Sequence, residues 1–162
     1  MAKRRYPVTP AVRFLRAKGV TFNPFVYTYV QHGGTRQAAE ACGVCEHHVI
    51  KTLVLETDAQ KALLMLMHGD RDVSTRTLAR TIGAKRLQTA SPDRAVAATG
   101  YRVGGISPFG TRQQLPVFLQ ESVLSLERVL INGGKRGFMV EIAPMVIVDT
   151  LAAVPIDAAV KA

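Results

Sequence analysis

Two glycine-rich stretches hold the residues of this sequence that are best suited to chemistry. Residues 100–110 contain four glycines and one proline, and residues 132–137 contain three more glycines together with Lys135 and Arg136. Glycine leaves backbone N–H groups unobstructed, and successive exposed N–H groups form a concavity that binds anions. A tight turn leading into a strand is the alternative for the first stretch taken alone. Because the second stretch adds two cations, the pair predicts one site for an anionic or carbonyl-bearing ligand.

Lys51 is a third candidate, because it is the only charged residue within the apolar strand pattern at residues 50–55. A lysine aimed into a pocket would bind a phosphate or carboxylate as a point charge. The alternative is a lysine on an edge strand, where its charge discourages pairing with other chains.

The Cys42-Gly43-Val44-Cys45 motif, followed by His47 and His48, raises a redox or zinc hypothesis. A thioredoxin-type site requires its first cysteine at a helix N-terminus, whereas Cys42 falls at a predicted helix end. A structural zinc site requires four ligands, and the chain has no further cysteine. The sequence therefore predicts incidental cysteines, with no metal and no cofactor, and leaves a thiol redox protein as an alternative.

Turn and cap signals divide the chain into the elements that must position these residues. Five helices are predicted at residues 11–18, 35–41, 74–82, 91–99 and 144–151, with Thr9, Thr35 and Ser91 as N-terminal caps. Seven strands are predicted at residues 22–29, 49–56, 62–68, 85–89, 115–120, 129–132 and 138–142, with a hairpin turn at 57–61. This order favours an α+β fold with a strongly curved mixed sheet over a doubly wound one.

Length and charge limit the class of protein. At 162 residues the chain is expected to form one domain, residues 1–162. Its formal charge of +9 is uneven, since residues 1–112 hold 17 Lys or Arg against 7 Asp or Glu, a net of +10. Such an excess favours a polyanionic partner. With no apolar run of 18 residues and no signal-peptide pattern, no membrane association is expected, and the cytoplasm is the expected location.

Several motifs in order along the chain resemble those of one known family. They are Thr9-Pro10-Ala11, Lys51-Thr52-Leu53, Gly83-Ala84-Lys85, the GGISP motif at residues 104–108 and the GGKRG motif at residues 133–137. Together they resemble the YbaK/EbsC family of Cys-tRNA(Pro)/Cys-tRNA(Cys) deacylases. This resemblance implies a single domain with a barrel-like mixed sheet flanked by helices, related to the editing domain inserted in bacterial prolyl-tRNA synthetases.

The resemblance also implies a set of site residues. As catalytic residues it implies Lys51, Gly104, Gly105 and Ser107. As substrate-binding residues it implies Tyr29, Pro108, Asn132, Gly133, Gly134, Lys135 and Arg136. Two features depart from the family pattern: Asn132 replaces the usual serine, and the segment at residues 32–34 is shorter and lacks the usual acidic residues. Both departures are expected to affect the choice of amino acid.

The resemblance implies metal-free hydrolysis of the ester that joins cysteine to mischarged tRNA(Pro). The implied partners are this aminoacylated tRNA and prolyl-tRNA synthetase. A tetrahedral oxyanion held by backbone N–H groups fits the glycine stretches. In the absence of a G-x-S-x-G motif, the substrate's own thiol or ribose hydroxyl is expected to supply the attacking group. The alternatives are a deacylase for another amino acid and a non-catalytic tRNA- or nucleotide-binding protein of the same fold.

Overall fold

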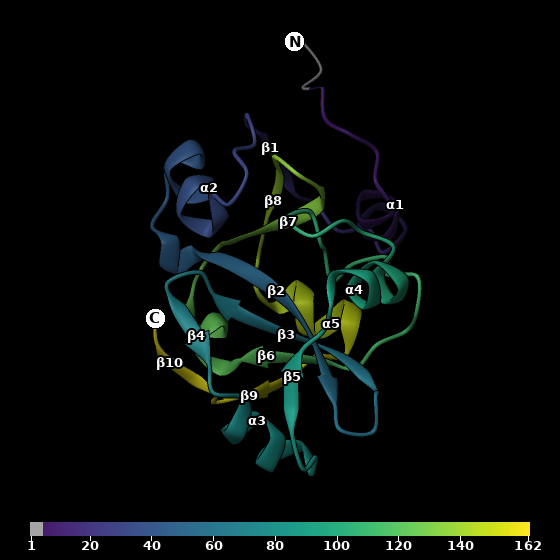
Figure 1. The fold of residues 1–162 in the computed structure, drawn as a ribbon. Helices are drawn as coiled ribbons and strands as arrows, with labels where there is room; N and C mark the ends of the chain where they lie inside the picture. Colours follow the sequence, from purple (N-terminus) through teal and green to yellow (C-terminus); the bar gives the residue numbers. More distant parts are fainter. Residues whose placement is uncertain (1–4) are drawn as a thin grey trace.

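The computed structural model describes residues 5–162, which form a mixed eight-stranded sheet with five α-helices around it (Figure 1). The strand order is β1-β8-β7-β2-β3-β6-β9, and β5 pairs with β2 beside this path. The strands are β1 (Asn23–Val26), β2 (Val49–Thr57), β3 (Ala62–His68), β5 (Leu87–Thr89), β6 (Val117–Gln120), β7 (Val129–Lys135), β8 (Phe138–Ile142) and β9 (Val154–Ile156). Within the described residues no pairing joins β1 to β9, so the path is open. The predicted α+β class and mixed sheet are confirmed.

The five helices are α1 (Pro10–Ala17), α2 (Gly34–Cys42), α3 (Thr75–Ile82), α4 (Pro92–Thr99) and α5 (Met145–Leu151). Thr9 and Ser91 cap α1 and α4 as predicted, each accepting a hydrogen bond from an N–H in the first turn. The predicted cap Thr35 is wrong, because α2 begins one residue earlier and Gly33 is its N-cap. The Thr35 hydroxyl is instead bonded to Glu46 and to the Gly69 carbonyl, which only the tertiary fold brings near it.

Three short strands were not predicted: β9 and the pair β4 (Arg71–Val73) and β10 (Ala159–Lys161), which form a separate two-stranded sheet. Each has only three residues, and each depends on a partner distant in sequence, so neither periodicity nor turn signals mark it. The predicted strand at 22–29 shortens to β1, which is an edge strand as Pro24 suggested.

Strands β2 and β3 form the predicted hairpin and lie at the centre of the molecule. Their residues alternate between two apolar clusters. Ile50 and Val54 pack into the larger cluster with α1, whereas Leu55 packs into a second cluster that contains Leu78 of α3. Strand β2, which carries Lys51, is therefore covered on both faces.

No helix in residues 5–162 is long and apolar enough to cross a membrane.

Candidate functional site

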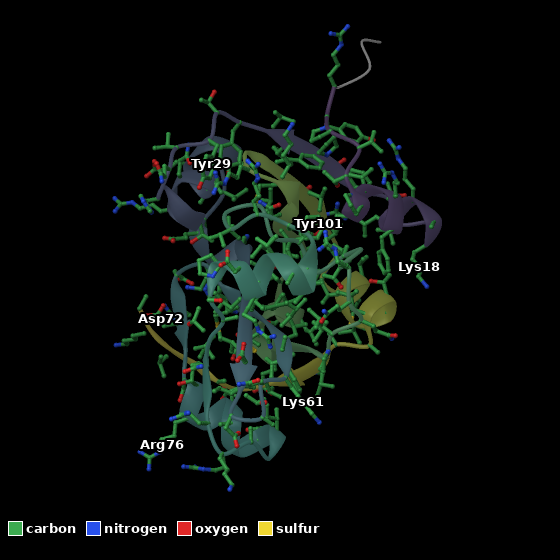
Figure 2. All side chains as sticks on the ribbon, turned by 45° about the vertical axis from the view of Figure 1, so that its right-hand side comes forward. Lys18, Tyr29, Lys61, Asp72, Arg76 and Tyr101 are labelled. Atoms are coloured by element: carbon green, nitrogen blue, oxygen red, sulfur yellow. The ribbon has the colours of Figure 1, made fainter. Side chains whose placement is uncertain are left out.

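A cavity of about 400 Å³ lies where β2, α2 and the two glycine-rich stretches meet. It brings together four predicted site residues from segments far apart in the sequence, Tyr29, Lys51, Gly104 and Asn132. Other parts of its wall come from Thr35, Ala38, Thr52, Val103 and Ile106. In Figure 2, Tyr29 lies at the α2 end of the molecule, and Tyr101, which belongs to the first glycine-rich stretch, lies nearer the middle.

The two glycine-rich stretches touch through their backbones at Gly105. A Cβ atom placed on Gly105 would lie 2.8 Å from the backbone nitrogen of Arg136 and 2.9 Å from the carbonyl carbon of Lys135. Both neighbours are main-chain atoms and have little freedom to move, so this contact requires glycine. The two stretches are therefore neighbours in space, and their service of one ligand site stays a prediction.

Asn132 joins the two stretches through its side chain. Its Nδ2 group donates to the Gly104 carbonyl at 3.2 Å, and its Oδ1 accepts from the N–H groups of Gly134 at 2.6 Å and Lys135 at 3.2 Å. A β-bulge between Asn132 and Lys135 allows this arrangement. Asn132, which departs from the family pattern, therefore connects the two loops by hydrogen bonds.

These bonds decide which N–H groups a ligand can use. The Gly134 and Lys135 N–H groups are bound by Asn132, and the Gly105 N–H donates to the Arg102 carbonyl at 2.8 Å. Within residues 5–162 the N–H groups of Gly104 and Ile106 have no hydrogen-bond acceptor, and both residues line the cavity. The Gly104 and Ile106 N–H groups are therefore the candidates for binding an anion, and the Gly105 N–H is not available for this role.

Arg136, in the second glycine-rich stretch, binds the backbone of the first stretch through its side chain. Its Nε donates to the Val103 carbonyl at 2.9 Å, and its guanidinium lies 5.2 Å from the centre of the Tyr29 ring. Together with Arg102 and Lys135, it lines a second cavity of about 370 Å³. The two predicted cations of the second stretch, Lys135 and Arg136, therefore line the second cavity and do not line the first.

Lys51 reaches the first cavity from an internal strand. Its strand, β2, pairs with β3 along one side and, on the other side, with β7 at Val49 and Ile50 and with β5 at residues 55–57, so β2 is not an edge strand of the sheet. At Lys51 itself the pairing among residues 5–162 is with β3. The Lys51 Nζ lies 3.5 Å from the Gly69 carbonyl and 3.5 Å from Oδ1 of Asp72, and its side chain is 23% exposed. Two weak contacts orient the ammonium group and leave it free to meet an anion in the cavity.

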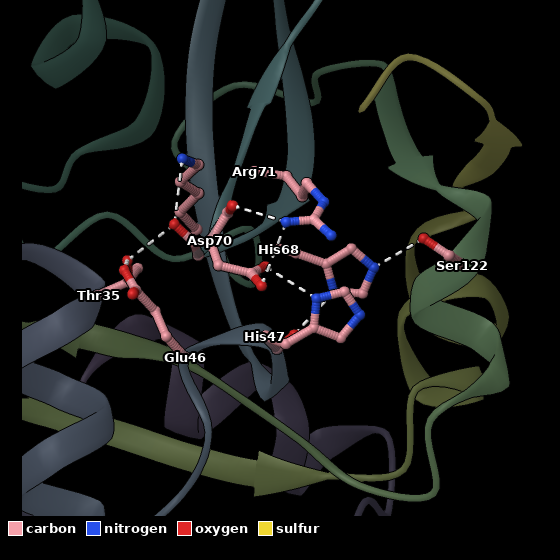
Figure 3. A network of polar contacts seen from close by, with 9 residues as sticks. Thr35, Glu46, His47, His68, Asp70, Arg71 and Ser122 are labelled. Atoms are coloured by element: carbon pink, nitrogen blue, oxygen red, sulfur yellow. Dashed lines mark hydrogen bonds and ion pairs between the residues drawn. The ribbon is translucent and has the colours of Figure 1, made fainter. Parts of the chain in front are cut away.

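The Gly69 carbonyl that contacts Lys51 belongs to the turn at residues 69–70, which follows β3. A network of polar contacts fixes this turn (Figure 3). The Thr35 hydroxyl donates to Glu46 at 2.8 Å and contacts the Gly69 carbonyl at 3.3 Å. The His47 ring contacts the Asp70 carboxylate at 2.8 Å. Although burial acts to raise it, the His47 hydrogen bond and nearby positive charge lower the pKa of Asp70. The carboxylate therefore stays ionised and keeps the turn in place.

His68 continues this network into the core. Its Nδ1 must donate to the His47 carbonyl at 2.7 Å, which leaves Nε2 to accept from the Ser122 hydroxyl, also at 2.7 Å. The His68 ring stacks on His47 with centroids 3.7 Å apart, and the residue is buried. Burial lowers the pKa of His68 below its usual 6.5, and the neutral ring fits both bonds.

We expect acid to destabilise the protein through His68. Because its pKa is lower in the folded state, the unfolded chain binds more protons as the pH falls below about 6.5, and the free energy of unfolding falls. Urea unfolding between pH 8 and pH 5 measures this slope. His68→Gln should be less stable at pH 8 and should show a shallower slope, whereas His32→Gln, on an exposed residue, should keep the wild-type slope. An equal slope in His68→Gln would contradict the assignment.

Three predicted residues lie in the wall behind the loops and do not line either cavity. Ser107 and Pro108 are buried, and the Ser107 hydroxyl accepts a hydrogen bond from the Phe109 N–H at 3.2 Å. Gly133 is also buried, and its carbonyl accepts a bond from the Thr9 hydroxyl, the N-cap of α1. In this arrangement the three residues support the shape of the loops.

Thr52 is a cavity-lining residue that the sequence reasoning did not single out. It follows Lys51 on β2 and lines the cavity, and its Oγ1 is buried without a hydrogen-bond partner among residues 5–162. A buried hydroxyl without a partner is costly, so such a group is rare unless a ligand completes it. Alternation along an apolar strand gives no signal for this role.

The two cysteines lie at the end of α2 and line neither of the two cavities at the loops. Both are free thiols, and Cys45 is exposed. Burial, and then the Glu141 carboxylate, raise the pKa of the Cys42 thiol, which lowers its thiolate fraction and its reactivity. Among residues 5–162 no group of three or more His, Cys, Asp or Glu is placed to hold a metal ion.

Comparison with known proteins identifies the family of the chain. Residues 33–150, which are 118 of the 162 residues, match the family model described as "Aminoacyl-tRNA editing domain". An Enterococcus faecalis protein named "Putative Cys-tRNA(Pro)/Cys-tRNA(Cys) deacylase EbsC" is 27% identical over 151 residues, or 92% of each chain. The proline–tRNA ligase of Moorella thermoacetica is 31% identical over 73% of this chain but only 21% of the ligase.

Solved structures share the fold of the chain. A crystal structure described as "a putative trans-editing enzyme for prolyl tRNA synthetase" superposes with a TM-score of 0.83 at 24% identity, over 94% of this chain and 98% of that one. A second, of "hypothetical protein APE2540", superposes with a TM-score of 0.85 at 23% identity, over 93% of this chain and 99% of that one. Because the family model matches most of the length of this chain, the chain belongs to the aminoacyl-tRNA editing domain family, in its YbaK/EbsC group.

Proposed function

We propose that the chain hydrolyses the aminoacyl ester of mischarged tRNA, with Cys-tRNA(Pro) as its substrate. The observation that carries the proposal is the first cavity, which is lined by Lys51 and by Gly104 and Ile106, whose N–H groups have no acceptor within residues 5–162. An ester carbonyl bound there would develop its negative charge beside donors that are already in place. In this proposal residues 1–162 act as one editing domain.

The reaction needs an attacking group, and the cysteine of the substrate supplies it. Its thiol attacks its own carbonyl carbon, the bond from that carbon to the ribose oxygen breaks, and the ribose oxygen takes up the proton. Water then opens the cyclic thioester to release cysteine. Holding the thiol against the carbonyl raises its effective concentration, so that the residues around the cavity mainly position the substrate.

The second cavity fits the rest of the 3′ end. Arg102 and Lys135 are exposed there and form no ion pair within residues 5–162, and Arg136 shares the same wall. Guanidinium and ammonium groups favour phosphate. We assign this cavity to the phosphates that precede the terminal adenosine, so that the strand crosses the loop contact at Gly105 into the first cavity.

Deacylation of a panel of mischarged tRNA(Pro) species tests the proposal. Cys-tRNA(Pro) should be hydrolysed much faster than Ser-tRNA(Pro), although serine is nearly the same shape and smaller. Comparable rates on both would contradict attack by the substrate thiol. No hydrolysis of any aminoacyl-tRNA, with tRNA binding retained, would favour the non-catalytic binder.

Thr52→Val should separate stability from activity. The change removes a buried hydroxyl that has no partner among residues 5–162, so the melting temperature should stay the same or rise. The value of kcat/KM should fall about tenfold, because the variant cannot form one hydrogen bond of about 1.4 kcal/mol to the substrate. Thr52→Ser is the matched control and should keep activity. A valine variant with normal activity would remove Thr52 from the site, whatever its stability.

A further inference from the structure

Four cations surround a depression of about 430 Å³ at the end of the molecule formed by α3 and β5. They are Arg76, Arg80, Lys85 and Arg86, and all four are exposed. Within residues 5–162 none of them forms an ion pair, and no carboxylate lines the depression. Figure 2 shows Arg76 projecting from this end into solvent. We call these four residues the α3 cluster.

Helix stability does not explain the α3 cluster. Arg76 lies in the first turn of α3, which contains no acidic residue, and a cation there opposes the helix dipole. Arg76 and Arg80 are four residues apart, so two like charges lie on the same helix face and repel each other. Only Arg80, in the last turn, has a favourable local position. The stability of α3 therefore does not account for the pair Arg76 and Arg80.

Strand β2 relates the α3 cluster to the first cavity. Lys51 at one end of β2 lines the cavity, and Thr57 at the other end pairs with Leu87, the residue after Arg86. Six residues of extended strand separate these points, or roughly 20 Å. Alternation along β2 places Lys51 on the same sheet face as Leu53 and Leu55, which pack in the cluster that contains Leu78 of α3. Of the three β2 residues that line the cavity, Lys51 thus lies on the sheet face that α3 covers, and Ile50 and Thr52 lie on the other face.

We propose that the α3 cluster binds the phosphate backbone of the tRNA body while the 3′ end occupies the first cavity. This inference rests on the proposed function. A separation of roughly 20 Å exceeds one nucleotide, so only a longer polynucleotide reaches both places. The four groups are exposed and come from a helix and the turn after it, as is typical of contacts to a backbone and not of a pocket that encloses a small anion.

The experiment compares full-length and shortened substrates. In Arg76→Gln/Arg80→Gln/Lys85→Gln/Arg86→Gln, the KM for aminoacylated full-length tRNA should rise at least tenfold with kcat unchanged. The same variant should hydrolyse an aminoacylated CCA trinucleotide like the wild type. The logarithm of the affinity for tRNA falls linearly with the logarithm of the salt concentration, and removal of one cation that binds a phosphate reduces the steepness of this fall by about 1. For binding of uncharged tRNA to the fourfold variant, the steepness should therefore decrease by about 2 or more.

Lys18→Gln/Lys161→Gln is the matched control for the double variant Arg76→Gln/Arg80→Gln, since both lose two charges and neither control residue lines a described cavity. The inference is overturned if Arg76→Gln/Arg80→Gln binds tRNA like this control. Equal losses of activity on the trinucleotide and on full-length tRNA overturn it as well. Binding of uncharged tRNA is measured without catalysis, so failure of the proposed function alone, with no hydrolysis of any ester, leaves this test intact.

Discussion

Gly105→Ala is expected to lower kcat/KM for aminoacyl-tRNA about a hundredfold. The new methyl group would lie 2.8 Å from the Arg136 nitrogen and 2.9 Å from the Lys135 carbonyl carbon, and both are main-chain atoms. The two stretches must separate by several tenths of an ångström, which also disturbs the bond from Asn132 to the Gly104 carbonyl. A displacement of about 1 Å at a reacting centre is enough to cost about a hundredfold in rate.

Single-turnover kinetics on Cys-tRNA(Pro), with circular dichroism to confirm folding, measure this effect. Overpacking should also lower the free energy of unfolding by about 1–3 kcal/mol. Gly19→Ala is the control, because it places alanine at a φ of +68° in open space and strains the backbone far from the loops. That variant should lose stability and keep its activity within about twofold. A Gly105→Ala enzyme that is folded and fully active would refute the role of the loop contact.

Lys51→Ala is expected to lower kcat/KM at least tenfold and to leave the fold intact. Lys51 lies on an internal strand, and its ammonium group has two 3.5 Å contacts within residues 5–162. A charge-assisted hydrogen bond to the substrate contributes about 1.5–3 kcal/mol, which corresponds to a decrease of roughly ten- to a hundredfold. Because the Lys51 contacts within the protein are long and partly exposed, stability should change little.

Lys61→Ala provides the matched control on the same hairpin. Lys61 is exposed at the turn between β2 and β3 and lines neither of the two cavities at the loops. Lys61→Ala loses the same charge from the opposite end of the same hairpin, so an effect of net charge on tRNA binding would appear in both variants. Unchanged kinetics in Lys51→Ala would show that the lysine does not contact the substrate.

The elements that depend on local signals were predictable from the sequence. Thr9 and Ser91 cap their helices, the turn at 57–61 closes the hairpin, and the helix of residues 74–82 was placed within one residue of α3. Each of these features depends on backbone and side-chain preferences within a few residues. The two glycine-rich stretches were likewise recognisable, because clustered glycines are typical of sites where another group approaches the backbone closely.

The tertiary structure decided how these pieces act on one another. The Thr9 hydroxyl bonds to Gly133, 124 residues away, and Asn132 bonds to Gly104 across 28 residues. The folded loops bind the N–H groups of Gly105, Gly134 and Lys135 and leave that of Gly104 without an acceptor in residues 5–162. A glycine motif shows that the backbone is accessible. Which of its N–H groups remain available depends on how the loops fold and on the acceptors that the fold brings to them, and only the folded structure supplies both.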